Sequence, residues 1–319
     1  MKVRTLVLTA AAAALFVPIM AAQAPPQGAA APAAAPAAQA QPQAAPIRVF
    51  IRAGLKTHAE GQHDYPQFLS DWSKLLTARG AIVDGGLSFP SADALANTDV
   101  IVMYKGDAGY MTMRERAALE DFLARGGGLV GMHDAICADD EAWWATIFGG
   151  AKRHGEVNYT LEAEVPYTID QPNHPIMQGM TPFAITDEAF FKMTWASAPG
   201  IQVLSSAKIA ETASAKQAGF AGQVVPQIWT YERPFFPRLG GQTPFRAFVW
   251  MQGHNYANFT NAQVQPMLLR AISWAAKRPA DALATERPAR GGGGGGRRGG
   301  GAGGRGGAPT APTAPAGGN

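Results

Sequence analysis

The chain has 319 residues, and its 27 Lys and Arg against 24 Asp and Glu give a net charge of +3. The single cysteine, Cys137, excludes a disulfide bond within the chain, so the fold must be stabilised by its own core. Lys2 and Arg4 contribute +2 and residues 280–319 contribute +3, which leaves a net charge of −2 on the residues between them. A slightly acidic domain gives no reason to expect a nucleic acid as its partner.

The amino terminus has the pattern of a secretory signal peptide over residues 1–24. A basic start at Lys2 and Arg4 precedes an apolar run over residues 6–20, and small residues follow as far as Ala24. The run is shorter than the ~20 residues of a membrane-spanning helix, which favours a cleaved signal over an uncleaved anchor, the alternative interpretation. We therefore expect export to the periplasm or the medium, and no membrane-spanning segment after cleavage.

Two low-complexity segments flank the predicted domain. Residues 25–46 are rich in Ala, Pro and Gln, carry no charge, and are expected to form a disordered linker. Residues 280–319 form a Gly- and Arg-rich tail, and 15 of the 37 glycines lie after residue 290. Arginine among glycines is typical of RNA-binding tails, but this segment has no Phe or Tyr to stack on bases. We therefore favour a solvated, disordered tail.

Residues 47–279 are predicted to form one domain, because strands and helices alternate along its first half. Strands are expected at residues 47–53, 81–83, 100–104 and 129–132. One helix is expected to begin at Asp64, with Pro66 in its first turn, and another at Thr112, which forms a capping box with Glu115. This order predicts an α/β three-layer sandwich, in which helices cover both faces of a mostly parallel sheet.

The second half of the domain shows shorter alternating stretches, which are typical of additional strands, some of them antiparallel. These stretches are residues 159–165, 201–204, 227–231 and 247–251. A last helix is expected near Pro266, with Leu268, Leu269 and Ile272 on its core face. The residue pattern leaves the order of these strands in the sheet open.

Histidines gather where the predicted strands end. In an open parallel sheet, ligands bind beyond the carboxyl ends of the strands, and four of the six histidines lie at such positions. Candidates for substrate binding at these ends are His58, His63, Asp134 and Tyr256. For His58 and His63, an ordinary surface position is the open alternative.

His133 and His254 are the leading candidates for catalysis, because imidazole groups transfer protons near neutral pH and also bind metals. Glu188, from the adjacent pair Asp187-Glu188, and Asp107 are further candidates, as bases or as hydrogen-bond partners of sugar hydroxyls. For each of these residues, a structural hydrogen bond at a strand end or a turn is the alternative interpretation.

A divalent metal such as zinc is compatible with this set of residues. Its predicted ligands are His133, His254 and His154, although His154 follows two basic residues and is equally suited to a solvated position. The sequence contains no H-x-x-x-H or H-E-x-x-H pair, so the ligands would have to converge from separate loops.

Three segments, in this order, resemble motifs of the ThuA-like (trehalose-utilisation) family. They are Gly126-Gly127-Gly128-Leu129-Val130-Gly131-Met132-His133, then His174-Pro175-Ile176 with Asp187-Glu188 downstream, then Gly253-His254 ahead of a helix ending at residues 271–275. The resemblance covers nearly all of residues 47–279. It implies a flavodoxin-like fold similar to that of class I glutamine amidotransferases, and a role in carbohydrate metabolism with disaccharides and keto-sugars as substrates.

The same resemblance argues against glutamine amidotransferase activity. In those enzymes a Gly-x-Cys triplet after the equivalent strand places the nucleophile on a tight elbow. The matching triplet here is Gly131-Met132-His133, so a histidine replaces the cysteine. Cys137 lies four residues further on and is not expected to point the same way.

The leading hypothesis is an exported enzyme that acts on a sugar, disaccharide or keto-sugar through histidine and carboxylate acid–base chemistry, with or without a metal. Isomerisation, elimination and hydrolysis all fit this chemistry. The alternatives are a non-catalytic sugar-binding module of the same fold and a hydrolase that uses Cys137 as its nucleophile. The oligomeric state is left open.

Overall fold

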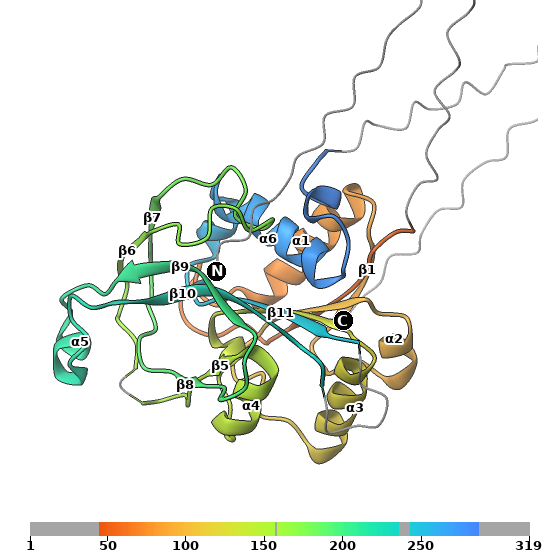
Figure 1. The fold of residues 1–319 in the computed structure, drawn as a ribbon, viewed down its shortest axis with the longest axis horizontal. Helices are drawn as coiled ribbons and strands as arrows, with labels where there is room; N and C mark the ends of the chain where they lie inside the picture. Colours follow the sequence, from red (N-terminus) through yellow and green to blue (C-terminus); the bar gives the residue numbers. More distant parts are fainter. Residues whose placement is uncertain (1–44, 157, 236–242, 287–319) are drawn as a thin grey trace, which may run out of the picture. The chain divides into compact units, whose positions relative to one another are not determined.

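The computed structural model describes residues 45–286, apart from residue 157 and residues 236–242 (Figure 1). The predicted signal peptide, residues 25–44 of the predicted linker and the tail from residue 287 onwards lie outside the described residues. Within the described part of the chain, no helix is long and apolar enough to cross a membrane.

A nine-stranded sheet, in the order β2-β1-β3-β4-β11-β10-β9-β6-β7, is the centre of the described domain. Its strands are β1 (Arg48–Ala53), β2 (Ile82–Gly86), β3 (Val100–Tyr104), β4 (Gly128–Met132), β6 (Ala163–Tyr167), β7 (Phe183–Asp187), β9 (Ile201–Lys208), β10 (Val224–Arg233) and β11 (Phe245–Trp250). Neighbours from β2 to β11 are parallel, and neighbours from β11 to β7 are antiparallel. Two short strands, β5 (Gly150–Ala151) and β8 (Thr194–Trp195), pair separately. The predicted mixed sheet is confirmed.

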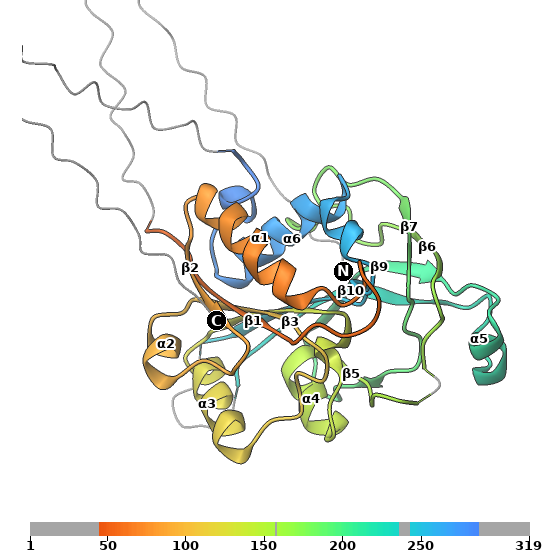
Figure 2. The same ribbon diagram turned by 180° about the vertical axis from the view of Figure 1, so that it is seen from behind.

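Helices cover both faces of the sheet, as Figures 1 and 2 show from opposite sides. They are α1 (Tyr65–Ala78), α2 (Ala92–Ala96), α3 (Met113–Ala124), α4 (Glu141–Phe148), α5 (Ala213–Ala218) and α6 (Val264–Ala275). α1 and α6 lie on one face, and α2, α3 and α4 on the other. Successive side chains of a strand point to opposite faces, so in β3 Val102 joins the core under α1 and α6, whereas Ile101 and Met103 join the other core. The three-layer architecture is confirmed.

The local signals in the sequence act as expected at several helix ends. The Thr112 hydroxyl accepts a hydrogen bond from the backbone N–H of Glu115, whose carboxylate accepts one from the backbone N–H of Thr112. Pro66 lies in the first turn of α1, and α6 begins two residues before Pro266. Each signal depends only on residues within one helical turn, so it is readable without the fold.

Three features differ from the sequence-based expectations. The strand expected at residues 159–165 lies at Ala163–Tyr167, and Tyr159 forms only an isolated bridge with Phe190. The strand β7 and the helices α2, α4 and α5 were not predicted: α2 and α5 have five and six residues, and α4 contains Trp143 and Trp144 in an apolar segment without a clear helical stripe. The packed chain also continues beyond residue 279, the predicted end of the domain.

That continuation is short but well connected. Leu283 is buried, and its backbone N–H donates to the Ser273 hydroxyl of α6. The Arg79 guanidinium donates to the carbonyl of Ala284, and Arg270 forms an ion pair with Asp281. The apolar side chain of Leu283 therefore joins the core, although residue 283 belongs to the predicted tail that begins at residue 280.

Candidate metal centre and active site

The strand order brings two distant loops to one edge of the sheet. β4 and β11 are parallel neighbours, and Met132 at the end of β4 pairs with Trp250 at the end of β11. His133 follows β4 directly, and His254 lies four residues after β11. A third loop, between β1 and α1, joins them because the backbone N–H of His63 donates to the carbonyl of His254 at 2.9 Å.

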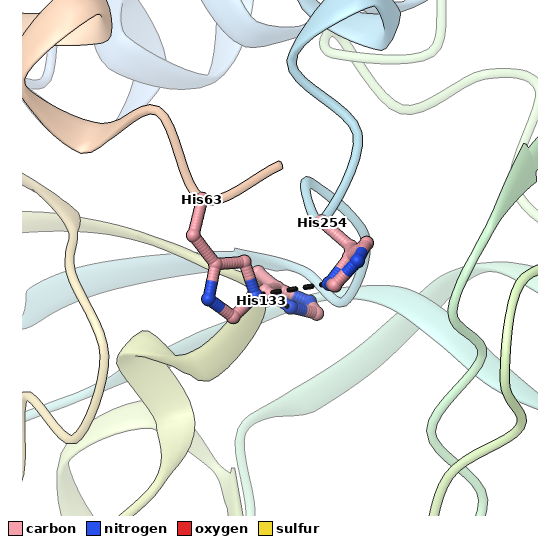
Figure 3. A group of neighbouring side chains, drawn as sticks. All are labelled: His63, His133 and His254. Atoms are coloured by element: carbon pink, nitrogen blue, oxygen red, sulfur yellow. Dashed lines mark hydrogen bonds between the residues drawn. The ribbon is translucent and has the colours of Figure 1, made fainter. Parts of the chain in front are cut away.

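Three buried imidazoles meet at this edge (Figure 3). The Nε2 atom of His63 lies 2.9 Å from Nε2 of His133 and 3.0 Å from Nδ1 of His254. The other ring nitrogen of His63 lies 3.0 Å from the Thr57 hydroxyl. The structure thus places the two predicted catalytic histidines together, with His63, predicted as a substrate-binding residue, as the third member of the cluster.

The outer nitrogens of two of these rings face groups that only accept hydrogen bonds. Nδ1 of His133 lies 3.3 Å from the carbonyl of Met251, and Nε2 of His254 lies 3.5 Å from the Glu162 carboxylate. A neutral His133 must carry its proton on the outer Nδ1, which faces this carbonyl, so its inner Nε2 presents a lone pair to His63. For His254, the outer Nε2 lies near Glu162 and the inner Nδ1 lies 3.6 Å from Glu188. Imidazole nitrogens that face one another at such distances need a proton or a cation between them. An outer nitrogen hydrogen-bonded to a carbonyl, as in His133, is the arrangement found around metal-binding histidines.

The protonation state of the cluster suits metal binding. Burial lowers the pKa of His63 to about 2, helped by the neighbouring His133. Burial also lowers the pKa of His133 to about 4 and lowers that of His254. All three rings are therefore neutral near pH 7, the form that ligates a metal. Nitrogens about 3 Å apart can be shared by one ion, because zinc–nitrogen bonds are about 2.1 Å long.

Two carboxylates flank the three histidines. The Glu188 carboxylate oxygens lie 3.8 Å from Nε2 of His133 and 3.6 Å from Nδ1 of His254. Asp134 has one oxygen 3.9 Å from Nε2 of both His63 and His133. Burial raises the pKa of Glu188 to about 8, and the nearby Asp134 carboxylate adds to the effect. The site thus concentrates imidazole and carboxylate groups, which are the ligand types that divalent cations such as zinc bind.

Asp134 is charged because of its neighbours. Burial by itself would raise the pKa of Asp134, but His133 and Lys152 lower it well below its usual range. The Lys152 ammonium lies 3.7 Å from the Asp134 carboxylate and is buried, with the Phe190 ring 3.8 Å away. Sequence reasoning missed Lys152, and its only signal was its place next to Arg153 and His154.

Asp187 has a positioning role that sequence reasoning also missed. Its buried carboxylate accepts hydrogen bonds from the backbone N–H groups of Gly253, His254 and Asn255, and from the Asn258 side chain at 2.7 Å. These bonds hold the loop that carries His254. The adjacent pair Asp187-Glu188 was the signal, but it did not show which carboxylate faces the site and which one holds the loop.

A second pair, Asp107 and His154, lies on a cavity beside the histidine cluster. Nδ1 of His154 is 2.8 Å from the Asp107 carboxylate, and this hydrogen bond raises the pKa of His154. The cavity has a volume of about 460 Å³, and His63 and Asp134 also line it. In the structure the third imidazole beside His133 and His254 is thus His63, whereas His154, predicted as a metal ligand, is paired with Asp107.

The two remaining candidates lie in different surroundings. His58 is exposed, lines the same cavity, and its ring centroid is 4.0 Å from that of His63. The Tyr256 hydroxyl instead donates to Asp71 on α1 at 2.9 Å, and Tyr256 is not among the residues that line the cavity. The structure therefore brings His58, but not Tyr256, to the predicted substrate site.

Strained backbone is concentrated in these loops. Among the described residues, five other than glycine have positive φ, and four of them are His58, His63, Asp107 and His133, with φ between 46° and 64°. Non-glycine residues in this conformation cost stability and cluster at functional sites. At His133 the strain lies directly after β4, as in the tight elbow that the amidotransferase resemblance implied.

Comparison with known proteins agrees with this geometry. The family model described as ThuA, trehalose utilisation, matches residues 57–275. The chain belongs to the ThuA family. Among solved structures, a ThuA-like protein from Bacteroides uniformis is 20% identical, with 76% of this chain and 98% of that chain covered and a TM-score of 0.54. A ThuA-like protein from Parabacteroides merdae is 19% identical, with coverages of 73% and 90% and a TM-score of 0.54. None of the curated proteins matches the chain.

Membership of the ThuA family associates the chain with carbohydrate metabolism, and the two solved structures confirm its fold. The environment of Cys137 in this ThuA family member argues against a cysteine nucleophile. The thiol is buried and donates a hydrogen bond to Asp134, 3.3 Å away. Burial raises the pKa of Cys137 well above its usual value, so the reactive thiolate does not form near neutral pH.

Proposed function

We propose that this ThuA family member binds a divalent metal such as zinc through His63, His133 and His254, and transforms a sugar, disaccharide or keto-sugar beside it. The observation that carries the proposal is the convergence of three buried nitrogens, two of which lie on rings whose outer nitrogens face acceptors. A structural histidine pairs its one N–H donor and its one acceptor nitrogen separately, and this does not require ring nitrogens of three histidines to meet at one point.

Acid–base groups of the chain lie near this centre. A divalent ion held by the three histidines would polarise a carbonyl or hydroxyl oxygen of a bound sugar. His154, oriented by its hydrogen bond to Asp107, reaches the cavity and suits proton transfer at a carbon next to a carbonyl group. Glu188 supplies a second carboxyl group at the histidines. Proton abstraction of this kind leads to isomerisation or elimination without a covalent nucleophile.

The substrate class follows from the family and from the cavity. The family description is trehalose utilisation, which points to disaccharides. A cavity of about 460 Å³ lies within the roughly 300–1,000 Å³ typical of small-molecule sites. Its walls combine carboxylates and imidazoles, which hydrogen-bond sugar hydroxyls, with the apolar side chains of Leu55 and Leu87.

Elemental analysis combined with a substrate screen tests this proposal. The protein is purified without chelators, its metal content is measured, and it is incubated with trehalose and with oxidised disaccharides. We expect about one ion per chain and conversion of at least one sugar. H154Q and D107N should lose most of the turnover but keep the metal, since neither residue belongs to the histidine cluster.

Two outcomes decide between the alternatives. Tight sugar binding without product after long incubation would identify a non-catalytic sugar-binding module. If the metal-free protein turned over the sugar at the rate of the metal-loaded protein, the proposed role of the metal in the reaction would be wrong. H174N is the matched control: the ring of His174 packs on Trp274, and its Nδ1 accepts from the backbone N–H of Ile176.

We also propose that the protein works outside the cytoplasm, because residues 1–24 have the basic, apolar and small-residue pattern of a cleaved signal. Amino-terminal sequencing of the mature protein should give a start between residues 23 and 31. A soluble cytoplasmic protein that still begins at Met1 would contradict the proposal.

A further inference from the structure

The Tyr65 hydroxyl is a buried polar group with no hydrogen-bond partner among the described residues. Tyr65 begins α1, directly after the loop that carries His63, and the side chain is buried. Two other buried tyrosines of this region have partners: Tyr104 donates to the carbonyl of Gly253, and Tyr167 donates to the Gln252 side chain. Buried polar groups are nearly always paired, so an unpaired one needs an explanation.

The location of Tyr65 supplies that explanation. Tyr65 lines the same cavity as His63, Asp107 and Asp134, and its ring centroid is 5.2 Å from that of His63. A Cβ atom added at Gly106 would lie 3.5 Å from the hydroxyl oxygen. The hydroxyl therefore lies next to Gly106, on a residue that lines the cavity together with His63, Asp107 and His154.

The ring of Tyr65 is fixed in place. A Cβ atom added at Gly54 would approach the ring to 2.9 Å, so a larger residue there would displace it. On its other side the Tyr104 ring packs edge-on, with 4.6 Å between the centroids. The side chain cannot change rotamer to reach another partner without breaking this packing. The hydroxyl is therefore free to donate only to a group bound in the cavity.

The hydroxyl is suited to act as a donor. A tyrosine side chain carries a phenolic O–H group that donates one hydrogen bond. A neutral O–H donor next to carboxylates matches the oxygen of a neutral ligand, such as a sugar carbonyl or hydroxyl group.

We propose that Tyr65 is a substrate-binding residue whose hydroxyl donates a hydrogen bond to a carbonyl or hydroxyl oxygen of a sugar bound beside His63. The proposal rests on the proposed function, because it assigns the cavity to a sugar. In this position the hydroxyl fixes the orientation of the sugar against the histidine cluster. A donor aimed at a carbonyl oxygen also stabilises the negative charge that develops there when a neighbouring carbon loses a proton.

A purely structural role for the hydroxyl predicts different behaviour. If only the ring mattered, phenylalanine would pack equally well in this position. Because the hydroxyl has no partner in the protein, Y65F leaves no other group unpaired, and the free protein should be as stable as the wild type or more stable. Loss of binding without loss of stability therefore separates a substrate contact from a structural one.

Calorimetric titration of the full-length, metal-loaded protein with trehalose, and with the keto-disaccharide made from it by oxidation, tests the proposal. We expect Y65F to bind at least one of these sugars tenfold or more weakly, with unchanged metal content and an unchanged or higher Tm. Y231F is the matched control, since Tyr231 is buried in β10 and its hydroxyl accepts from Arg233. Y231F should bind both sugars as the wild type does.

Each other outcome has a definite meaning. Equal sugar affinity of Y65F and the wild type overturns the role of Tyr65 but leaves the proposed function intact. A wild-type protein that binds neither sugar overturns both proposals. A Tm several degrees lower in Y65F would show that the hydroxyl has a partner inside the protein, and would also overturn the role of Tyr65.

G106A provides a second test that keeps the tyrosine. The added methyl group would lie in van der Waals contact with the hydroxyl oxygen and hinder an approaching sugar oxygen. We expect weaker sugar binding by G106A at unchanged metal content. Wild-type affinity in this variant would count against the proposal even if Y65F failed to fold.

Discussion

The Nε2 atoms of His63 and His133 lie 2.9 Å apart, although 70 positions separate the two residues in the chain. His133 must use its other nitrogen to donate to the Met251 carbonyl, so its Nε2 faces His63 as an acceptor. Nδ1 of His254 lies 3.0 Å from the same Nε2 atom of His63. One proton on this Nε2 atom can bridge to only one of the two neighbouring nitrogens, whereas a metal ion would contact all three.

A bound metal should stabilise the fold. A ligand present at 100 times its Kd contributes about 2.7 kcal/mol, which corresponds to roughly 5–10 °C in Tm for a domain of this size. Chelation should therefore lower the Tm of the wild type by about this amount in scanning calorimetry. H133A should show no response to the chelator, whereas H174A should respond as the wild type does. A wild-type Tm that changes neither with the chelator nor with added zinc would contradict the metal site.

The Asp187 carboxylate is expected to be essential for the His254 loop. D187A would leave several buried N–H donors of residues 253–258 without an acceptor. Each unpaired donor lowers the free energy of unfolding by about 1–3 kcal/mol. We expect urea unfolding to show a loss of at least 3 kcal/mol, together with loss of metal. D170A is the control, because the exposed Asp170 accepts only from the hydroxyls of Thr168 and Ser206, and it should cost less than about 1 kcal/mol.

The buried pair of Lys152 and Asp134 should show strong coupling. K152M leaves the Asp134 carboxylate buried without its cation, which costs about 3–5 kcal/mol. D134N likewise leaves the ammonium unpaired, so the double variant should lose clearly less stability than the sum of the two single variants. Urea unfolding with a chelator present measures this coupling without a contribution from the metal. Additive losses would show that the two charges do not stabilise each other.

Asp99 should contribute to the acid sensitivity of the fold. Its carboxylate accepts from the backbone N–H of Arg48 at 2.9 Å and from the guanidinium at 2.7 Å. Burial opposes ionisation, but these bonds lower the pKa of Asp99 overall. A carboxyl group with a lowered pKa in the folded state stabilises the fold above its unfolded pKa of about 3.9, and this contribution disappears as the pH falls through the folded pKa.

D99N should therefore be less stable than the wild type at pH 7, by about 1 kcal/mol once solvent screening of the half-exposed Arg48 is allowed for. The difference should shrink below about pH 4, where the wild-type carboxyl group becomes protonated. Urea unfolding at a series of pH values measures the difference in unfolding free energy between D99N and the wild type. E164Q, which replaces an exposed carboxylate on β6, is the matched control and should be as stable as the wild type at pH 7 to within about 0.5 kcal/mol. A D99N deficit that stays constant down to pH 2 would contradict the linkage.

Much of the first half of the fold follows from local patterns. The capping box of Thr112 and Glu115, Pro66 in the first turn of α1, and the apolar run of β3 each depend on residues a few positions apart. Hydrogen bonds and side-chain packing at that range are set by the sequence itself. The rule that ligands bind beyond strand ends then placed His133 and His254 at one edge before the strand order was known.

The sequence by itself determined the family, the α/β class and the histidines that gather at strand ends, because these depend on composition, spacing and short-range periodicity. Tertiary structure alone decided that β11 lies beside β4, that His63 rather than His154 joins His133 and His254, and that Tyr65 faces the cavity unpaired. It also decided the burial of Lys152 and the loop-holding bonds of Asp187. Such contacts join residues up to 191 positions apart. They depend on how the whole sheet packs, and no pattern of neighbouring residues encodes them.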